Sequence, residues 1–213
     1  MKVGTDGVLL GAWAEGGKRI LDVGTGTGLI ALMMAQRFPD ASVVGIDIDA
    51  LACQQAQENV ADSPFAGRVG VSCVSLQDYS GPDTFDCIVA NPPFFENSLR
   101  NPDERKAAAR HTDMLPFDEL FNGVERLLSD DGVFSVIVPS DFLERFISNA
   151  YISGFYITRQ YDIKTTIRKP VKRCLLAFRK LRPELLDRRE VYLQDADGNR
   201  NAWYSELMRD FYL

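Results

Sequence analysis

Short apolar runs alternate with helix-patterned segments through the first two thirds of the chain, and this alternation constrains the fold most strongly. Apolar runs typical of buried strands cover residues 19–23, 42–47, 69–74, 85–90 and 133–138. Apolar residues at helical spacing cover residues 29–37, 50–60 and 116–128 between them. Repeated strand–helix units of this kind predict a largely parallel sheet with helices on both faces.

The remainder of the chain adds one helix and two longer strands to this pattern. Ser140 or Asp141 is expected to cap a helix that runs to about Ser153. Strands are expected at 155–163 and 174–178, followed by a short helix at 203–212. The prediction is an α/β fold, with a Rossmann-like seven-stranded sheet and helices on both faces, formed by residues 1–213 as a single domain. Ligands bind such sheets at the carboxyl ends of the strands, so functional residues are expected just after the first four strands.

Composition excludes several classes of protein. The 213 residues are 46% hydrophobic and 25% charged, as in an ordinary globular chain, and no apolar run approaches the roughly 18 residues of a membrane-spanning helix. The four cysteines lack metal-site spacing, which is typical of a reducing compartment. His111 is the single histidine and no G-x-S-x-G sequence occurs, which argues against histidine-rich metal sites and serine hydrolases. A cytoplasmic protein without membrane contact, bound metal or disulfides is expected.

A glycine-rich turn follows the first strand and carries the first chemical signal. Its acidic residue and glycines are Asp22, Gly24, Gly26 and Gly28. Glycines let the backbone turn tightly and let a ligand approach main-chain N–H groups at a helix start. A dinucleotide site favours G-x-G-x-x-G, whereas this G-x-G-x-G after an acid resembles motif I of class I S-adenosylmethionine methyltransferases. The alternative is a structural turn.

Acidic and polar residues after the second and third strands extend this candidate cofactor site. The carboxylate of Asp47 can accept both ribose hydroxyls, Ile48 can pack on an adenine ring, and Asp49 is better placed to cap the following helix. After the third strand, methyltransferases usually place an acid that binds the adenine amine. Here Ser75 and Leu76 hold that place, so either Ser75 serves or the loop is shifted by three residues to Asp78.

The most specific motif, Asn91-Pro92-Pro93-Phe94, directly follows the fourth strand. Two prolines end the strand and stiffen the turn, which fixes the directions of the Asn91 side chain and the Pro92 carbonyl. Two acceptors at one rigid point suit an exocyclic amino group, and Phe94 can stack on its ring. Asn91, Pro92 and Phe94 are therefore the candidate catalytic residues, and Asn91 also borders the cofactor. A plain strand-terminating turn is the alternative.

Positive charge is concentrated near the end of the chain. The net charge is −6, yet residues 159–182 carry nine Lys or Arg and one Asp, whereas residues 1–158 carry 11 Lys or Arg and 22 Asp or Glu. An acidic body repels phosphates, so a nucleic-acid partner requires a local basic surface. The candidate RNA-binding residues are Arg168, Lys169, Lys172 and Arg173, with Arg105, Lys106 and Arg110 in the loop after the Asn91 turn. An ordinary solvated strand pair is the alternative.

Taken together, these motifs resemble the bacterial tRNA1(Val) N6-adenine methyltransferases, which modify the adenine at position 37. The matching segments are Met1–Trp13, the glycine motif from Asp22, Asn91–Phe94, Lys172–Phe178 and Asp210–Leu213. The resemblance implies S-adenosylmethionine as cofactor and tRNA as substrate, and it places Thr5 and Asp6 in a segment that closes over the methionine part of the cofactor. Members of this family usually carry a basic, aromatic stretch before the segment that begins here at Met1.

Rival functions share parts of these motifs. Guanine-N2 methylation of ribosomal RNA uses the same Asn-Pro-Pro-Phe turn, often with a duplicated domain. Methylation of a protein glutamine amide uses Asn-Pro-Pro-Tyr with a preceding helical domain. Cysteine-dependent base methylation needs a nucleophile in the turn after the fourth strand, whereas Cys87 lies within that strand. A monomeric enzyme is expected, and a non-catalytic cofactor-binding subunit is the rival from another class.

Overall fold

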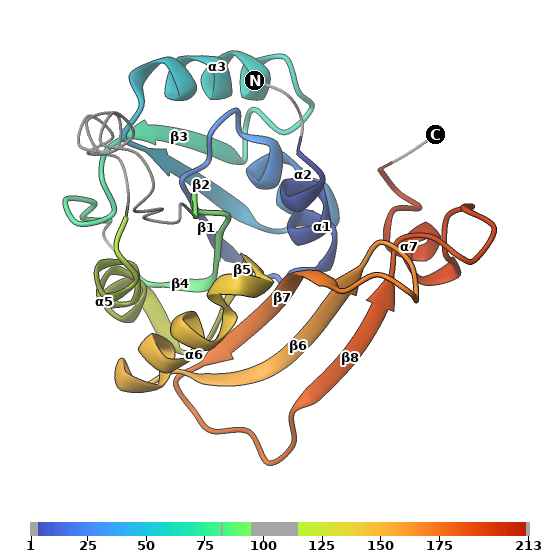
Figure 1. Cartoon of the computed structure of the whole chain (residues 1–213). Helices are drawn as coiled ribbons and strands as arrows, with labels where there is room; N and C mark the ends of the chain where they lie inside the picture. Colours follow the sequence, from blue (N-terminus) through green and yellow to red (C-terminus); the bar gives the residue numbers. More distant parts are fainter. Residues whose placement is uncertain (1–3, 82, 95–114, 212–213) are drawn as a thin grey trace, which may run out of the picture.

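The computed structural model describes residues 4–81, 83–94 and 115–211 and contains an eight-stranded sheet in the order β3-β2-β1-β4-β5-β7-β6-β8 (Figure 1). Strands β1 to β5 pair in parallel, β7 lies antiparallel between β5 and β6, and β8 pairs in parallel with β6. The strands are β1 Arg19–Val23, β2 Ser42–Asp47, β3 Val69–Cys73, β4 Phe85–Ala90, β5 Leu128–Pro139, β6 Tyr156–Lys164, β7 Val171–Arg179 and β8 Asp187–Tyr192.

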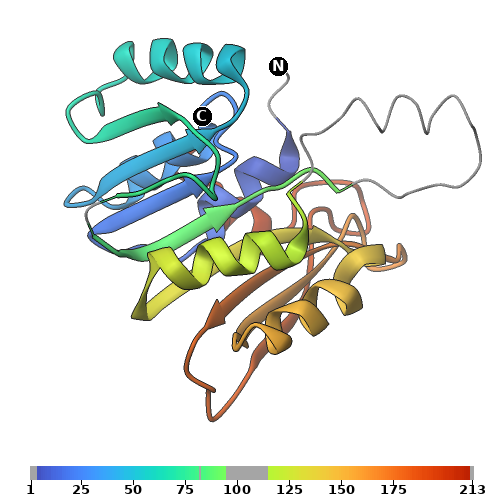
Figure 2. The same ribbon diagram turned by 90° about the vertical axis from the view of Figure 1, so that its left-hand side faces the viewer.

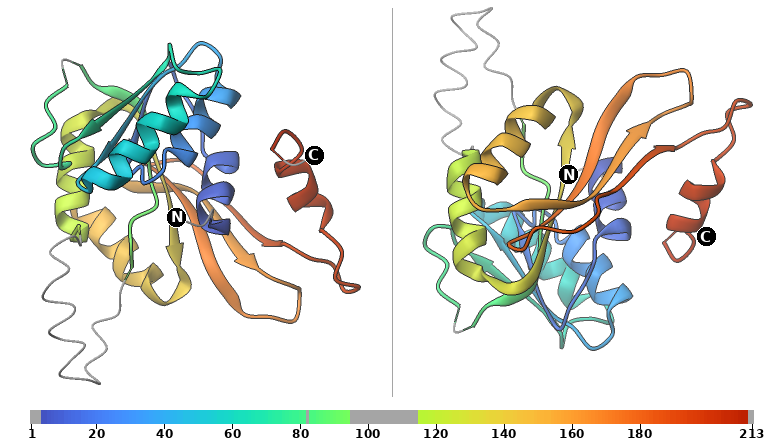
Figure 3. Two further views of the ribbon diagram at one scale, coloured as in Figure 1. Left: turned by 90° about the horizontal axis from the view of Figure 1, so that it is seen from above. Right: turned by 90° about the horizontal axis from the view of Figure 1, so that it is seen from below.

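Helices cover both faces of the sheet and divide the core into two apolar clusters. The helices are α1 Thr5–Trp13, α2 Leu29–Arg37, α3 Ala50–Ala61, α5 Phe117–Leu127, α6 Leu143–Ile152 and α7 Ala202–Leu207. Residues of α1, α2, α3 and α7 contribute to one cluster, and residues of α5 and α6 to the other. Figure 2 shows α5 and α6 together on one face, and both views of Figure 3 place α7 on the side of α1. Within the described residues, no helix has the length and apolar composition that a membrane span requires.

The sheet topology brings the ends of several elements to one edge. Strand order reverses at β1, which pairs with β2 on one side and β4 on the other, so the carboxyl ends of all three strands meet there. The turn between β6 and β7 reaches the same edge, because Pro139 at the end of β5 pairs with Arg173 near the start of β7. Motifs far apart in the sequence therefore share this edge.

The predicted α/β fold is confirmed, but the sheet has eight strands and not seven. The missed strand β8 has one buried residue, Val191, and its charged side chains hide the alternation by which strands are recognised. Helix α1 was also missed. All residues from Gly7 to Trp13 are buried, so α1 shows no polar face. The predicted cap at Ser140 or Asp141 was wrong, because a 3-10 turn at Ser140–Phe142 precedes α6 and Phe142 is its N-cap.

Candidate active site

A cavity of about 700 Å³ opens at the carboxyl edge of the sheet, between the ends of β1 to β4 and the start of α5. This volume lies within the range of small-molecule sites in proteins. The lining residues are Val23, Gly24, Gly26, Ile46, Asp47, Ile48, Asp49, Ala52, Val74, Ser75, Leu76, Gln77, Asp78, Pro92, Pro93, Leu115, Pro116 and Glu119.

The glycine turn forms one wall of the cavity. Gly24 and Gly26 have φ angles of 69° and 57°, and a Cβ on either would meet no atom within 4 Å. Positive φ favours glycine, and the open space beside both residues lets a ligand approach the backbone. Gly28, with φ 82°, does not line the cavity; a Cβ there would lie 3.4 Å from Cβ of Ala56 in α3.

Asp22 is buried behind the glycine turn, where it organises the turn. One carboxylate oxygen, Oδ2, accepts hydrogen bonds from Thr25 Oγ1 at 2.6 Å and from the Ala31 backbone N–H at 3.1 Å. The other oxygen, Oδ1, is buried without a hydrogen-bond partner. Burial raises the pKa of Asp22 to about 7, against the lowering effect of its hydrogen bonds. Asp22 therefore supports the turn and does not line the cavity.

The raised pKa makes the contribution of Asp22 to stability pH-dependent. The folded chain binds the proton of this carboxyl group more tightly than the unfolded chain does. The resulting stabilisation is fully present below the unfolded pKa of 3.8 and is lost as the pH rises through about 7. We expect the unfolding free energy of Asp22→Asn, relative to the unmodified chain, to rise with pH by up to about 1.4 kcal/mol per pH unit. Urea unfolding between about pH 5 and pH 8 measures it. A constant difference would show that Asp22 stays ionised.

Asp47 lies at the end of β2, and its carboxylate faces the glycine turn. Oδ2 accepts the Gly26 N–H at 2.8 Å and Oδ1 accepts the Asp49 N–H at 3.0 Å. A carboxylate has about four acceptor positions, so roughly two remain for a ligand. Ile48 is 50% exposed beside it. Asp49 caps α3 by accepting the backbone N–H groups of Leu51 and Ala52, which confirms its predicted role.

The loop after β3 brings both candidate adenine-binding residues to the cavity. Ser75 Oγ donates to Asp78 Oδ2 at 2.7 Å and accepts the Asp78 backbone N–H at 3.1 Å. Ser75, Leu76 and Asp78 all line the cavity. Ser75 and Asp78, the two alternatives for the adenine contact, therefore belong to one hydrogen-bonded turn.

The Asn91 turn borders the opposite end of the cavity. Pro92 and Pro93 line it, whereas the half-buried Asn91 does not and instead lies beside α1. The position of a Cβ on Gly7 is 3.9 Å from Asn91 Nδ2. Within the described residues, neither the Asn91 side chain nor the Pro92 carbonyl has a hydrogen-bond partner. Neither group is therefore engaged by another described residue.

Phe94 packs in an aromatic cluster at the end of the turn. Its ring centroid lies 5.6 Å from Phe142, 5.9 Å from Phe117 and 6.2 Å from Phe146, and Phe94 is half-buried. These contacts fix the ring on one side. Arg145 of α6 is exposed and its guanidinium lies over the Phe117 ring at 5.5 Å.

The remaining predicted residues lie beyond the cavity walls. Thr5 and Asp6 form the first turn of α1 and do not line the cavity, and Asp6 accepts a hydrogen bond from Arg173. Arg168, Lys169 and Lys172 are exposed in and beside the β6–β7 turn. Arg105, Lys106 and Arg110 lie outside the described residues.

Two contributions to the site were missed by the sequence reading. Leu115, Pro116 and Glu119 close the cavity from the start of α5, which the sequence indicated only as a helix. Helix α1 reaches Asn91, and its buried apolar run was the available signal.

The thiol of Cys87 is not placed to act as a nucleophile in this cavity. Cys87 is fully buried within β4, its thiol donates to the Glu15 carbonyl at 2.9 Å, and burial raises the pKa of this thiol. A buried thiol of raised pKa is a poor nucleophile. Across residues 4–81, 83–94 and 115–211, no cluster of His, Cys, Asp or Glu is arranged to hold a metal ion.

Comparisons with known proteins agree with this geometry. Residues 4–144 match the family described as methyltransferase small domain. The tRNA1(Val) (adenine(37)-N6)-methyltransferase of Bacteroides thetaiotaomicron is 45% identical over 216 residues, covering 100% of this chain and 91% of that protein.

Solved structures share the fold. A predicted O-methyltransferase from Agrobacterium tumefaciens aligns with a TM-score of 0.72 at 17% identity, covering 96% of each chain. The glycopeptide N-methyltransferase MtfA, solved with S-adenosylmethionine, aligns with a TM-score of 0.61 at 10% identity, covering 82% of this chain and 94% of that chain. Such low identities show the fold alone.

Proposed function

The chain belongs to the tRNA1(Val) (adenine(37)-N6)-methyltransferases, and we propose that it transfers a methyl group to N6 of adenine 37 in tRNA1(Val). It is a methyltransferase that uses S-adenosylmethionine. The observation that carries the proposal is the position of the Asn91 turn, whose prolines wall the same cavity as Gly24, Gly26 and Asp47.

The polar and apolar groups around the cavity fit the cofactor. We assign the ribose hydroxyls to the free acceptor positions of Asp47 and the adenine ring to the exposed face of Ile48. The linked oxygens of Ser75 and Asp78 suit the adenine amine. Gly24 and Gly26 leave the backbone open for close approach. When bound, S-adenosylmethionine supplies an electrophilic methyl group on a sulfonium.

The Asn91 turn is assigned to the acceptor base. The side-chain oxygen of Asn91 and the carbonyl of Pro92 each accept one N–H of the adenine amino group. This fixes the two N–H directions and leaves the nitrogen lone pair free to point along a defined line. The chain needs no strong base, because the amine loses its proton after it is methylated. Phe94, held by the surrounding phenylalanines, stacks on the ring.

Exposed cations near the same edge are assigned to the tRNA backbone. Arg168, Lys169 and Lys172 make no ion pair with any described residue. Unpaired Lys and Arg side chains attract phosphates, and the acidic remainder of the chain limits this attraction to the basic turn. A tRNA substrate implies action in the cytoplasm. One copy of the chain supplies every group assigned here, so we propose a monomeric enzyme.

Mass spectrometry of modified nucleosides tests the proposed function. We expect incubation with labelled S-adenosylmethionine to place N6-methyladenosine in tRNA1(Val) that carries adenine at position 37. A matched transcript with guanine at that position should stay unlabelled. Label recovered as N2-methylguanosine in ribosomal RNA would favour the rival enzyme, and no transfer to any RNA would favour a non-catalytic subunit.

A further inference from the structure

The ion pair between Arg173 and Asp6 joins the start of β7 to the first turn of α1. We propose that Arg173 is a positioning residue that holds this turn beside Asn91, and not a contact to RNA phosphate. The proposal rests on the proposed function. Arg173 would then serve the methyl-transfer step, although its place among basic residues predicted RNA binding.

The contacts of Arg173 differ from those of its basic neighbours. Its Nε donates to Asp6 Oδ2 at 2.7 Å, and its Nη1 donates to the Lys172 carbonyl at 2.9 Å. The side chains of Arg173 and Asp6 are 38% and 34% exposed. Lys169 and Lys172 are exposed and have no such partner within the described residues. A phosphate would have to compete with a carboxylate already bound to Arg173, whereas the two lysines are free to bind one.

The first turn of α1 lies against the Asn91 turn. One residue after Asp6, the Cβ position of Gly7 is 3.9 Å from Asn91 Nδ2 and 3.5 Å from Leu29 Cδ2 at the start of α2. Asn91 has no hydrogen bond of its own within the described residues, and the α1 turn packs against its amide. A shift of this α1 turn would therefore misalign the acceptor oxygen that we assign to the target amine.

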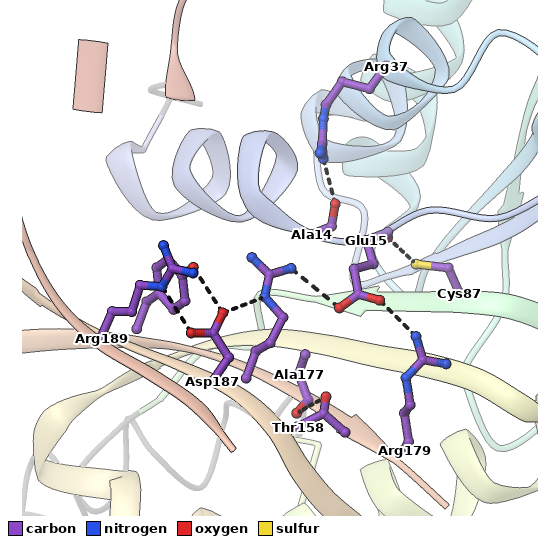
Figure 4. A network of polar contacts seen from close by, with 11 residues as sticks. Ala14, Glu15, Arg37, Cys87, Thr158, Ala177, Arg179, Asp187 and Arg189 are labelled. Atoms are coloured by element: carbon purple, nitrogen blue, oxygen red, sulfur yellow. Dashed lines mark hydrogen bonds and ion pairs between the residues drawn. The ribbon is translucent and has the colours of Figure 1, made fainter. Parts of the chain in front are cut away.

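A separate set of contacts fixes the opposite end of α1 (Figure 4). The Glu15 carboxylate binds Arg179 at 2.7 Å and Arg159 at 3.3 Å, which attaches the end of the helix to β7 and β6. Arg37 donates to the carbonyls of Gly11 and Ala14 at 2.9 and 2.7 Å. The buried run from Gly7 to Trp13 holds the middle of the helix. Loss of the Asp6–Arg173 pair should therefore loosen the first turn and leave the helix folded.

Steady-state kinetics of Arg173→Gln with tRNA provides the first test. We expect kcat to fall about tenfold while the salt dependence of KM for tRNA stays unchanged. Asp6→Asn should have the same effect, and the double variant should be no worse than either single variant, because both changes remove one interaction. An unchanged kcat for Arg173→Gln would overturn the proposal.

Two control variants separate positioning from RNA binding and from general destabilisation. Lys172→Gln, at a side chain that we assign to phosphate, should lower the slope of log KM against log salt by about one. If Arg173→Gln flattens that slope to the same extent, Arg173 contacts phosphate and the proposal fails. Arg19→Gln removes a 2.7 Å pair with Asp83 at the amino end of β1 and should leave kcat unchanged.

Hydrogen exchange tests the same pair without relying on activity. Arg173→Gln should raise the exchange rate of the amides whose hydrogen bonds close the first turn of α1, beginning with Val8, which donates to the Gly4 carbonyl, and leave those near Trp13 protected. Equal protection of the first turn in both proteins would overturn the proposal even if the unmodified chain methylated no RNA. Methylation of tRNA by the unmodified chain tests the proposed function separately.

Discussion

Asn91→Ala is expected to lower kcat for tRNA methylation by at least about a hundredfold while leaving the dissociation constant of S-adenosylmethionine nearly unchanged. The side-chain oxygen of Asn91 is one of the two acceptors assigned to the target amine. Without it, one N–H direction is no longer fixed and the lone pair has no defined orientation. The cofactor is expected to be unaffected because the residues assigned to its ribose and adenine lie at the end of β2 and in the loops after β2 and β3.

Single-turnover kinetics with saturating cofactor and tRNA measures this effect. Asn91→Asp is the matched variant, because it keeps the shape and an acceptor oxygen, and it should retain more activity than Asn91→Ala. Both variants should unfold at nearly the temperature of the unmodified chain, since the half-buried side chain has no hydrogen bond within the described residues. If Asn91→Ala kept a third or more of kcat, Asn91 would have no part in the mechanism.

The parts of the site that could be predicted are those whose positions depend on short, continuous segments of the sequence. Asp47 and the glycines follow buried strands, and parallel strands place their carboxyl ends at one edge, so local motifs were enough to predict that they meet. The Asn91 turn was predicted on the same grounds. Its acceptor oxygens need only the strand end and the two prolines, which are adjacent in the chain.

The parts that could not be predicted depend on contacts between distant residues. Asp6 and Arg173 are separated by 167 positions, and charge alone placed Arg173 among the RNA-binding residues. Helix α1 lacks a polar face because it is enclosed by α2 and the sheet, so its periodicity carried no signal. Strand β8 is held by backbone pairing with β6. Charged side chains allow this pairing, but they give no sequence pattern that predicts a strand. In each case the deciding contact was tertiary.

Asp47→Ala is expected to weaken the binding of S-adenosylmethionine by about a hundredfold or more. Hydrogen bonds to a charged group contribute about 1.5–3 kcal/mol each, and two are assigned to the ribose hydroxyls. The substitution also removes the partners of the Gly26 and Asp49 backbone N–H groups, so the glycine turn loses a support on the cavity side. Because both effects weaken cofactor binding, kcat at saturating cofactor should fall much less than the affinity for S-adenosylmethionine.

Calorimetric titration of the cofactor into the purified variant measures this loss, with Asp49→Ala as the control. Asp49 neighbours Asp47, but its carboxylate is bound to the first turn of α3, so its removal should reduce stability by about 1 kcal/mol and change the affinity only a few-fold. Asp47→Asn keeps one acceptor oxygen and should fall between Asp47→Ala and the unmodified chain. If Asp47→Ala and Asp49→Ala bound the cofactor equally well, a general weakening of the β2–α3 connection would explain both, and the ribose would have to be held elsewhere.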